Sequence, residues 1–510
     1  MISLRETMRG GRGIEQSRPW PRHVVDHTSW LRAIREISKG HGDMLAQWSD
    51  GADVHMLLLD HESSDIGIVS IECPNGSFPS VAHMHPPALR LERAIRDIYG
   101  LEADGSSDAR RWLDHGRWGV RHPGAKPEPS EASGDAYAFL AAEGAPLHQI
   151  PVGPVHAGTI EPGHFRFSAN GEVVVRLEER LGYAHKGIEQ LMVDAPIDRA
   201  ARLAGRVSGD STVAYALAFA NAVEAALEIK VPRRAVYLRA LMAELERLAN
   251  HIGDVGAICN DASFSLMHTH ASILRERVLR ASRLCFGHRL MMDRIVPGGV
   301  VDDLTMEGVV ALHALLSGAK KIIPRFIDLY GDTTSIQDRT VGAGFLRPEL
   351  VKQYGCGGVI GRASGRGFDA RRAPGYAPYP ELSFKVGSAH AGDVDARIWV
   401  RFDEIKASFG LIEQILDKMP DGPIRIESLP EASETREGAA LIEGFRGDIF
   451  VWVRLGSARL GASVAVQRCH LRDPSWFQWP LLEAVIEGNI VADFPLCNKS
   501  FNCSYSGHDL

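Results

Sequence analysis

A leucine repeat in the middle of the chain limits its possible folds more than any other feature. Downstream of Pro232, large apolar side chains recur every three or four residues, at Leu238, Leu241, Leu245, Leu248 and Ile252. This spacing places them on one face of a helix, and proline is well tolerated at a helix start. Further long helices are predicted for residues 197–227, 268–292, 306–329 and 397–418. Because several of these stretches are rich in alanine, which permits close packing, we expect a helix bundle inside a large core.

Strand-like segments flank this helical region. Residues 53–60 and 66–73 are apolar runs typical of strands, and residues 87–99 form an amphipathic helix that ends at Gly100. Later in the chain, residues 164–177 carry the pattern of a β-hairpin, and residues 450–455 return to a strand pattern.

Composition divides the chain into two parts. Proline, glycine, serine and alanine predominate in residues 121–144, as is typical of a linker. We therefore predict an α+β chain with a small N-terminal α/β domain at residues 1–120 and a linker at 121–148. A large, mainly helical domain with β decorations is expected at residues 149–510.

Bulk properties exclude several classes of function. The net charge of −7 argues against a nucleic-acid partner, which would require a concentrated excess of Lys and Arg. Apolar residues do not run unbroken for long enough to span a membrane, and the first residues lack the apolar stretch of a signal peptide. The 7 cysteines are scattered and odd in number, which indicates reduced thiols in a cytosolic protein.

Several motifs resemble one known family. Gly153–Phe167 (GPVHAGTIEPGHFRF), Tyr183–Leu191 (YAHKGIEQL) and Val231–Asn250 follow one another in that family's order and spacing. The family contains the large subunits of energy-converting (group 4) nickel–iron hydrogenases, as in formate hydrogenlyase, and the 49-kDa-type subunit of respiratory complex I. Residues 1–120 resemble the 30-kDa-type subunit of complex I through Glu92–Gly100 (ERAIRDIYG). The resemblance covers nearly the whole chain and implies a hydrogenase-large-subunit fold for its larger part.

The same resemblance shows which metal ligands this chain lacks. In the hydrogenase branch, two Cys-x-x-Cys pairs bind nickel and iron through thiolates, the soft donors that such metals need. The four equivalent positions are Ala204, Val207, Ser504 and Gly507. The nearby Cys497 and Cys503 are not spaced as a Cys-x-x-Cys pair. We therefore expect no metal ligands and no nickel–iron centre in this chain.

The resemblance implies a set of site residues near the hairpin. Glu161 corresponds to a carboxylate that transfers protons in the hydrogenase branch, and a partly buried Glu can be tuned toward neutral pH. His164 is a second catalytic candidate, and His156 is a candidate for cofactor binding. The alternative is that all three bond to turn backbone. The tyrosine that holds a quinone in the complex I branch corresponds to Gly205, so that ligand is missing.

A glycine-rich loop supplies the remaining site candidates. Arg362 and Asp369 are predicted to be catalytic, with Arg372 as a cofactor-binding neighbour, because in the family this loop lines the active-site cavity. An Asp–Arg pair that fixes the loop is an equally physical interpretation. Asp393, with Arg397, resembles another pair beside the cavity. Glu244 and Glu246, on the leucine-rich helix, are expected to face solvent or another subunit.

Three functions fit these residues. The first is a subunit of a membrane-associated, complex I-like redox complex that transfers electrons or protons towards a quinone-like acceptor. The second is a non-catalytic scaffold that joins a small iron–sulfur subunit to ion-translocating membrane subunits. The third, a hydrogenase with displaced ligands, needs four soft donors where at most two are present. The resemblance implies a cytoplasmic location, peripheral on the inner face of the cell membrane.

Cofactors are expected outside this chain, apart from a quinone that its cavity could accommodate. The resemblance implies an iron–sulfur cluster in the partner subunit. NAD chemistry is assigned to another subunit, because the glycines of residues 355–367 do not follow a strand in a βαβ unit.

Overall fold

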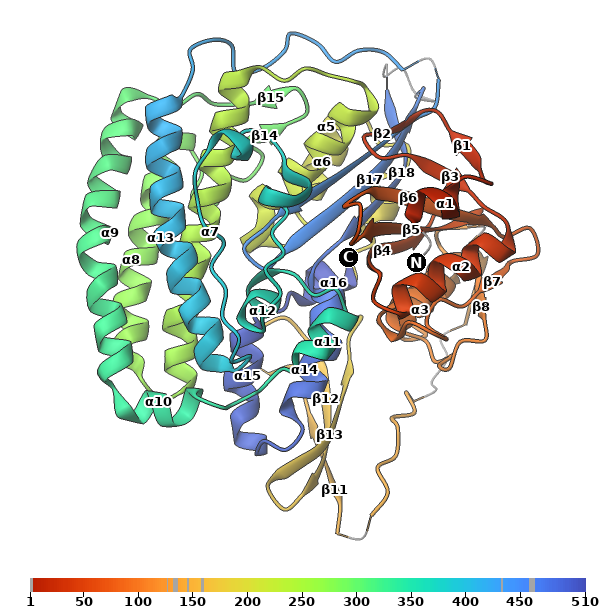
Figure 1. The fold of residues 1–510 in the computed structure, drawn as a ribbon, viewed down its shortest axis with the longest axis horizontal. Helices are drawn as coiled ribbons and strands as arrows, with labels where there is room; N and C mark the ends of the chain where they lie inside the picture. Colours follow the sequence, from red (N-terminus) through yellow and green to blue (C-terminus); the bar gives the residue numbers. More distant parts are fainter. Residues whose placement is uncertain are drawn as a thin grey trace.

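A bundle of long helices forms one side of the molecule. The computed structural model describes residues 3–125, 127–131, 136–144, 146–156, 160–432, 434–457 and 464–510. Figure 1 shows four long helices side by side at the left: α7 (Arg233–Asp261), α8 (Ser265–Phe286), α9 (Met306–Asp332) and α13 (Val394–Lys418). The leucine face of α7 is buried, with Leu238, Leu245 and Leu248 fully inaccessible to solvent. The predicted α+β class is confirmed. The predicted helix bundle is present, but it lies at one side of the molecule, and α8 and α9 each expose a face to solvent instead of lying inside the core.

One predicted helix is wrong. The alanine-rich stretch 197–227 is divided into α5 (Ile197–Ala204), a short 3-10 turn η2 (Gly209–Ser211) and α6 (Thr212–Ala226). The break begins at Gly205, and the carboxylate of Glu246 receives the N–H groups of Val213 (2.7 Å) and Ala214 (3.0 Å) at the start of α6. A tertiary cap therefore begins a new helix where periodicity predicts a continuous one.

A five-stranded sheet organises the N-terminal part of the chain. Its strand order is β1-β3-β6-β5-β4, and α2 (His27–Ser38) packs against it. The strands are β1 (Arg12–Ile14), β3 (Arg22–Val24), β4 (Gly42–Ser49), β5 (Asp53–Asp60) and β6 (Ile66–Glu72). The predicted helix is α3 (Leu89–Tyr99), which ends at Gly100 with φ of +72°. Only glycine adopts such a backbone readily.

The N-terminal part shares a sheet with the rest of the chain. A four-stranded sheet has the order β18-β17-β16-β2. Its strands are β2 (Ser17–Arg18), β16 (Arg436–Glu443), β17 (Asp448–Gly456) and β18 (Ala465–Arg472). Next to this sheet, the guanidinium of Arg22 contacts the carboxylate of Glu437 at 2.7 Å, and the rings of Trp48 and Trp452 lie 5.8 Å apart. The two parts are therefore packed together across a common core.

The hairpin sheet, α14 and α15 lie in the lower part of Figure 1, and α16 lies nearer its centre. The hairpin sheet consists of β11 (His148–Val152), β12 (His164–Asn170) and β13 (Val173–Arg180). The C-terminal segment forms α14 (Ser475–Ile486), α15 (Phe494–Phe501) and α16 (Tyr505–Asp509). Within the described ranges, every helix is too short or too polar to cross a membrane. All seven cysteines are buried free thiols.

Candidate functional site

The two segments that correspond to the family's cysteine pairs lie against each other. The Oγ atoms of Ser208, just after α5, and Ser504, just before α16, are 3.2 Å apart. We call Ala204, Val207, Ser504 and Gly507 the cysteine-equivalent site. Ala204 and Val207 are fully buried, and Ser504 caps α16 by accepting the N–H of Gly507 at 2.9 Å. The fold therefore brings together the two segments that the resemblance aligns with the cysteine pairs, and none of the four positions carries a thiol.

The cysteine-equivalent site does not fit a nickel–iron centre. Two of its side chains are apolar, and a Cβ atom built at Gly507 would overlap the carboxylate of Asp473. That carboxylate is itself satisfied, since it accepts hydrogen bonds from the Tyr215 hydroxyl (2.5 Å) and the Ser475 N–H (2.8 Å). Across the described ranges, no cluster of three or more His, Cys, Asp or Glu is arranged to bind a metal.

The two cysteines near this site are poor thiolates. Burial raises the pKa of Cys497 to about 12. Burial, together with the nearby Glu179 carboxyl, also raises the pKa of Cys503 well above its ordinary value. Metals bind the thiolate rather than the thiol, and burial disfavours the thiolate form of both side chains.

A lysine lies beside the cysteine-equivalent site. The ammonium of Lys186 donates to the carbonyls of Arg206 (2.9 Å) and Val207 (2.7 Å), at the end of α5. A cation at this position offsets the partial negative charge of a helix C-terminus. Lys186 therefore stabilises the turn on which Val207 lies.

The three candidates near the hairpin, Glu161, His156 and His164, mostly make hydrogen bonds to backbone groups. Glu161 is exposed, unlike the partly buried carboxylate expected from the sequence, and it accepts the N–H of Ser506 at 3.0 Å. His156 contacts the carbonyl of Gly163 at 2.7 Å. His164 is buried; its Nδ1 lies 3.3 Å from the Gly153 carbonyl, and its Nε2 accepts from Arg166 at 3.3 Å. Burial lowers the pKa of His164. Of the three, Glu161 is the one that contacts the segment carrying the cysteine-equivalent site.

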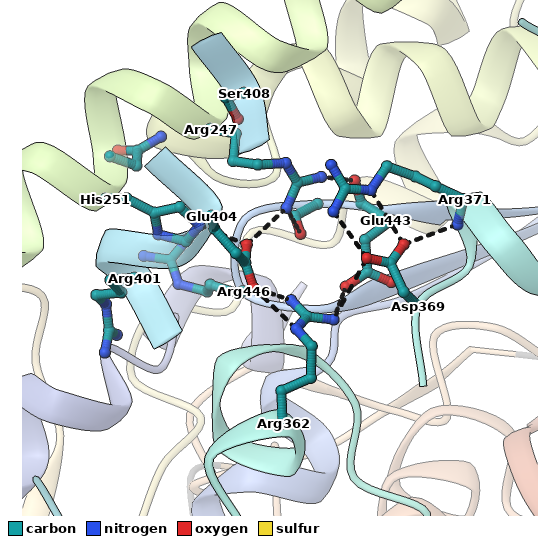
Figure 2. A network of polar contacts seen from close by, with 12 residues as sticks. Arg247, His251, Arg362, Asp369, Arg371, Arg401, Glu404, Ser408, Glu443 and Arg446 are labelled. Carbon is teal, nitrogen blue, oxygen red and sulfur yellow. Dashed lines mark hydrogen bonds and ion pairs between the residues drawn. The ribbon is translucent and has the colours of Figure 1, made fainter. Parts of the chain in front are cut away.

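The glycine-rich loop contributes to a buried ionic network, shown in Figure 2. Arg362 donates to Glu404 (2.8 Å) and to Glu443 (2.7 Å). Arg371 binds both Asp369 (2.7 Å) and Glu244 (3.0 Å). We define the ionic network as Glu244, Arg247, His251, Arg362, Asp369, Arg371, Glu404 and Glu443, all at most 2% exposed.

Helices α7 and α13 close the network from the bundle side. The Nε2 of His251 lies 2.7 Å from a Glu404 oxygen, and Arg247 lies 3.4 Å from the same carboxylate. The Nδ1 of His251 is buried and has no hydrogen-bond partner among the described residues. That nitrogen is free to accept a hydrogen bond, because a neutral histidine whose Nε2 donates to Glu404 keeps an acceptor at Nδ1.

The network has more carboxyl groups than guanidinium groups. Three arginines face four acids, and the resulting pKa values differ strongly. Burial, reinforced by the neighbouring Asp369, raises the pKa of Glu443 to about 7. Burial also acts on Glu404, but Arg362 and His251 outweigh it and hold its pKa well below the ordinary value. Among the acids of the network, Glu443 is thus the one whose charged form is least favoured.

The prediction that Glu244 and Glu246 face solvent or another subunit is wrong in the isolated chain. Glu244 is 0% and Glu246 is 8% exposed, because each has partners inside the core. Glu244 binds Arg371 and also accepts the hydroxyls of Tyr379 (2.8 Å) and Ser408 (2.7 Å). Burial raises the pKa of Glu246 to about 8. The helix that carries them, α7, is buried on its polar side as well as its leucine side.

The remaining sequence candidates lie outside the network. Arg372 is exposed and stacks on Phe384, 4.0 Å from the ring centroid. Asp393 caps α13 by accepting the N–H of Ala396 at 2.8 Å. Arg397 is buried and donates to Ser500 at 3.0 Å. Asp393 and Arg397 therefore make separate contacts, whereas Arg362 and Asp369 lie in one network.

Arg446 ties the turn that follows Glu443 to the two segments of the cysteine-equivalent site. It lies in the turn after Glu443, binds Asp210 through two hydrogen bonds of 2.8 and 2.6 Å, and donates to the Asn502 carbonyl at 2.5 Å. Asp210 follows α5, and Asn502 precedes Ser504. Sequence reasoning missed this arginine, because its partners lie 236 and 56 residues away along the chain and no local pattern signals them.

Comparisons with known proteins agree with this architecture. Residues 261–509 match the family described as the 49 Kd subunit of respiratory-chain NADH dehydrogenase, and residues 23–133 match its 30 Kd subunit. Formate hydrogenlyase subunit 5 of Escherichia coli is 29% identical, over 86% of this chain and 78% of the relative.

Two further relatives represent both branches of the family. Hydrogenase-4 component G of Escherichia coli is 30% identical, over 86% of this chain and 77% of the relative. An NADH-quinone oxidoreductase subunit of Desulfotalea psychrophila is 30% identical, over 68% of this chain and 92% of the relative. The chain therefore belongs to the family of the respiratory-chain NADH dehydrogenase 49 Kd subunit and its hydrogenase relatives, joined to a 30 Kd-type region.

Proposed function

We propose that this chain is a subunit of a membrane-associated, complex I-like oxidoreductase that transfers electrons or protons towards a quinone-like acceptor without a nickel–iron centre. The observation that carries the proposal is a contrast within one fold. The positions equivalent to the metal donors hold side chains that do not bind metals, whereas each carboxyl group of the ionic network contacts an arginine. The names of the relatives, which include hydrogenase components and an NADH-quinone oxidoreductase subunit, support the reaction class.

The ionic network supports a chemical role for the chain, because burying so many charged groups costs free energy. Removing charged groups from water carries a large desolvation penalty, and apolar residues of similar size usually stabilise a core as well or better. Glu443, with a pKa of about 7, can take up and release a proton under ordinary conditions. We assign it the proton-exchanging role. Asp369 raises the pKa of this carboxyl group and Arg362 lowers it.

The proposed partners are a small iron–sulfur subunit and ion-translocating membrane subunits. The proposed location is the cytoplasmic side, peripheral on the inner face of the membrane. Exposed apolar side chains near the hairpin, among them Val173 (43%), Val175 (45%) and Ile490 (37%), suit a surface that other subunits cover. Electron carriers would lie in those partners, and any NAD chemistry would too.

A scaffold that only couples its neighbours is the second candidate. The observation in its favour is Gly205, which stands where the complex I branch has a quinone-binding tyrosine. A scaffold would have no need of a proton-exchanging Glu443, so replacing that residue separates the two functions.

The test uses the complex purified from its native host. We expect nickel at background level and iron accounted for by partner clusters. We also expect quinone reduction that Glu443→Gln slows while leaving subunit composition unchanged. Stoichiometric nickel would overturn the proposal. Unchanged quinone reduction in the Glu443→Gln complex would leave the scaffold as the better description.

A further inference from the structure

A cleft separate from the ionic network opens between the N-terminal part and the hairpin. Its volume is about 950 Å³, comparable to a site for a peptide or a large ligand. One wall is the segment Arg110–Trp118, another is residues 136–139, and the third consists of β12, β13 and the residues that follow them. Five arginines line it, namely Arg110, Arg111, Arg117, Arg166 and Arg180.

Two of these arginines are neutralised by acids of the same chain. Arg110 binds Asp108 and Glu178, each at 2.6 Å. Arg111 binds Asp114, the acid that lines the cleft, at 3.3 Å. The other three have no carboxylate within ion-pair distance among the residues that the structure describes. The described lining of the cleft therefore contains three arginines without an ion-pair partner, whereas its one carboxylate, Asp114, is paired with Arg111.

Arg180 is the most constrained of these three arginines. It is 3% exposed, and its guanidinium donates to the backbone carbonyls of Trp112 and Asp114. It stacks on Tyr137, 4.5 Å from the ring centroid. Burial lowers the pKa of Arg180, because the charged guanidinium has lost its contact with water and has no carboxylate at ion-pair distance in the described part of the chain. A bound anion would remove that penalty.

Arg166 is a second arginine whose guanidinium is fixed in orientation by its neighbours. It stacks on Phe139, with 4.5 Å to the ring centroid, while its Nε donates to His164. Both stacked arginines are thus fixed in orientation before any ligand arrives. Such fixed, planar guanidinium groups bind carboxylates through paired hydrogen bonds and lose little side-chain entropy in doing so.

We propose that this cleft binds an acidic peptide segment of a neighbouring subunit through Arg117, Arg166 and Arg180. The proposal rests on the proposed function in one respect, namely that the chain works inside an assembly. A peptide suits the cleft because one wall is itself an extended segment, residues 136–139. The rings of Tyr137, Phe139 and Tyr183 offer flat apolar surfaces between the charges.

The first test is direct binding to the full-length chain. The probe is a fluorescein-labelled ten-residue peptide of alternating Glu and Gly, followed by fluorescence anisotropy. The double variant Arg117→Gln/Arg166→Gln should bind it at least about tenfold more weakly, corresponding to two charge-assisted contacts. The matched control is Arg277→Gln/Arg325→Gln, which removes two exposed arginines from α8 and α9. Equal loss in both variants would show unspecific attraction and overturn the proposal.

Two competing ligands are tested in the same way. Vesicles containing phosphatidylglycerol, or ATP, could also use the arginines. If either binds in an Arg117- and Arg166-dependent manner while the peptide does not, the cleft takes a phosphate group and the peptide proposal fails.

The second test locates the partner in the native complex. Tyr183, which is exposed and lines the cleft, is replaced by photoreactive p-benzoylphenylalanine, and the cross-linked peptide is identified by mass spectrometry. We expect an Asp- and Glu-rich segment of another subunit. Cross-links to apolar segments alone would overturn the inference but leave the proposed function intact. A chain that purifies without any partner subunit would instead contradict the proposed function.

Discussion

The cysteine-equivalent site and the ionic network accommodate buried polar groups in opposite ways. At the first, small and apolar side chains have replaced the donors, and Asp473 is satisfied by Tyr215 and Ser475. At the second, four acids and three arginines remain inside the core. Packing of small and apolar side chains is enough to stabilise the cysteine-equivalent site. The ionic network, in contrast, is stable only when each buried charge keeps its oppositely charged neighbour.

Arg362→Met is expected to produce the largest effect and is the direct way to break the network. It leaves Glu404 and Glu443 buried without their shared guanidinium, which should destabilise the fold by about 3–5 kcal/mol. Chemical unfolding of the purified chain measures the loss. The control is Arg325→Met, an exposed arginine of α9, which should change stability by less than about 0.5 kcal/mol. Similar losses in both would show that the network is not the stabilising element.

A pH series sharpens the assignment of the network proton to Glu443. Its pKa is about 7 in the folded chain and about 4.3 in an unfolded one. The folded state therefore binds more protons between these values, and stability should fall as pH rises from 5 to 8. On the order of 2–3 kcal/mol is expected from this residue.

Glu443→Gln should flatten that part of the profile. Unfolding free energies at pH 5 and pH 8, compared between the two proteins, give the contribution by difference. A profile that is equally steep in the variant would place the exchanging proton elsewhere, with Glu246 the next residue to replace because its pKa is about 8.

Gly507→Cys tests whether the cysteine-equivalent site is closed. The new Cβ would overlap the Asp473 carboxylate, so a loss of about 1–3 kcal/mol is expected. Gly209→Ala is the control, because nothing lies within 4 Å of a Cβ at that position. Tm by calorimetry compares them. A Gly507→Cys protein of unchanged Tm, or one that gains nickel when cysteines are also introduced at the other three positions, would contradict the closed site.

Ser504→Ala is expected to have the smallest effect. It removes the side chain that caps α16 and contacts Ser208, at about 1 kcal/mol. A Tm shift well beyond that of an ordinary helix cap would mean that the serine has a larger role than capping. The restoring variant Ser504→Thr should recover most of the loss.

Local features were predictable from the sequence because they depend on neighbours in the chain. The leucine face of α7, the strand at residues 53–60 and the glycine end of α3 follow from periodicity and backbone preference. The position of the hairpin was also predicted correctly. The break between α5 and α6 was missed because its cap comes from Glu246, a residue of another helix.

The candidate site was only partly predictable for a similar reason. Arg362 and Asp369 stood out as charges in a glycine-rich loop. Asp369 pairs with its near neighbour Arg371, but the partners of Arg362, Glu404 and Glu443, lie far away in sequence. Glu244 was misassigned because a polar residue on an amphipathic helix usually faces solvent. Its burial depends on Arg371, a pairing that no local pattern encodes. Whether the predicted residues carry the proposed chemistry stays a prediction for the variants above.

The strand β2 has a consequence for how this protein is made. Arg22, which directly follows this strand's turn, meets Glu437 across a separation of 415 residues. At a synthesis rate of ~5–20 residues per second, roughly 20–80 seconds pass between the emergence of one partner and the other. During that interval the N-terminal part leaves the ribosome with an unpaired edge and an uncovered apolar face. Expression at lower temperature or with added chaperones should therefore raise the yield of the full chain more than that of fragments lacking residues 1–120.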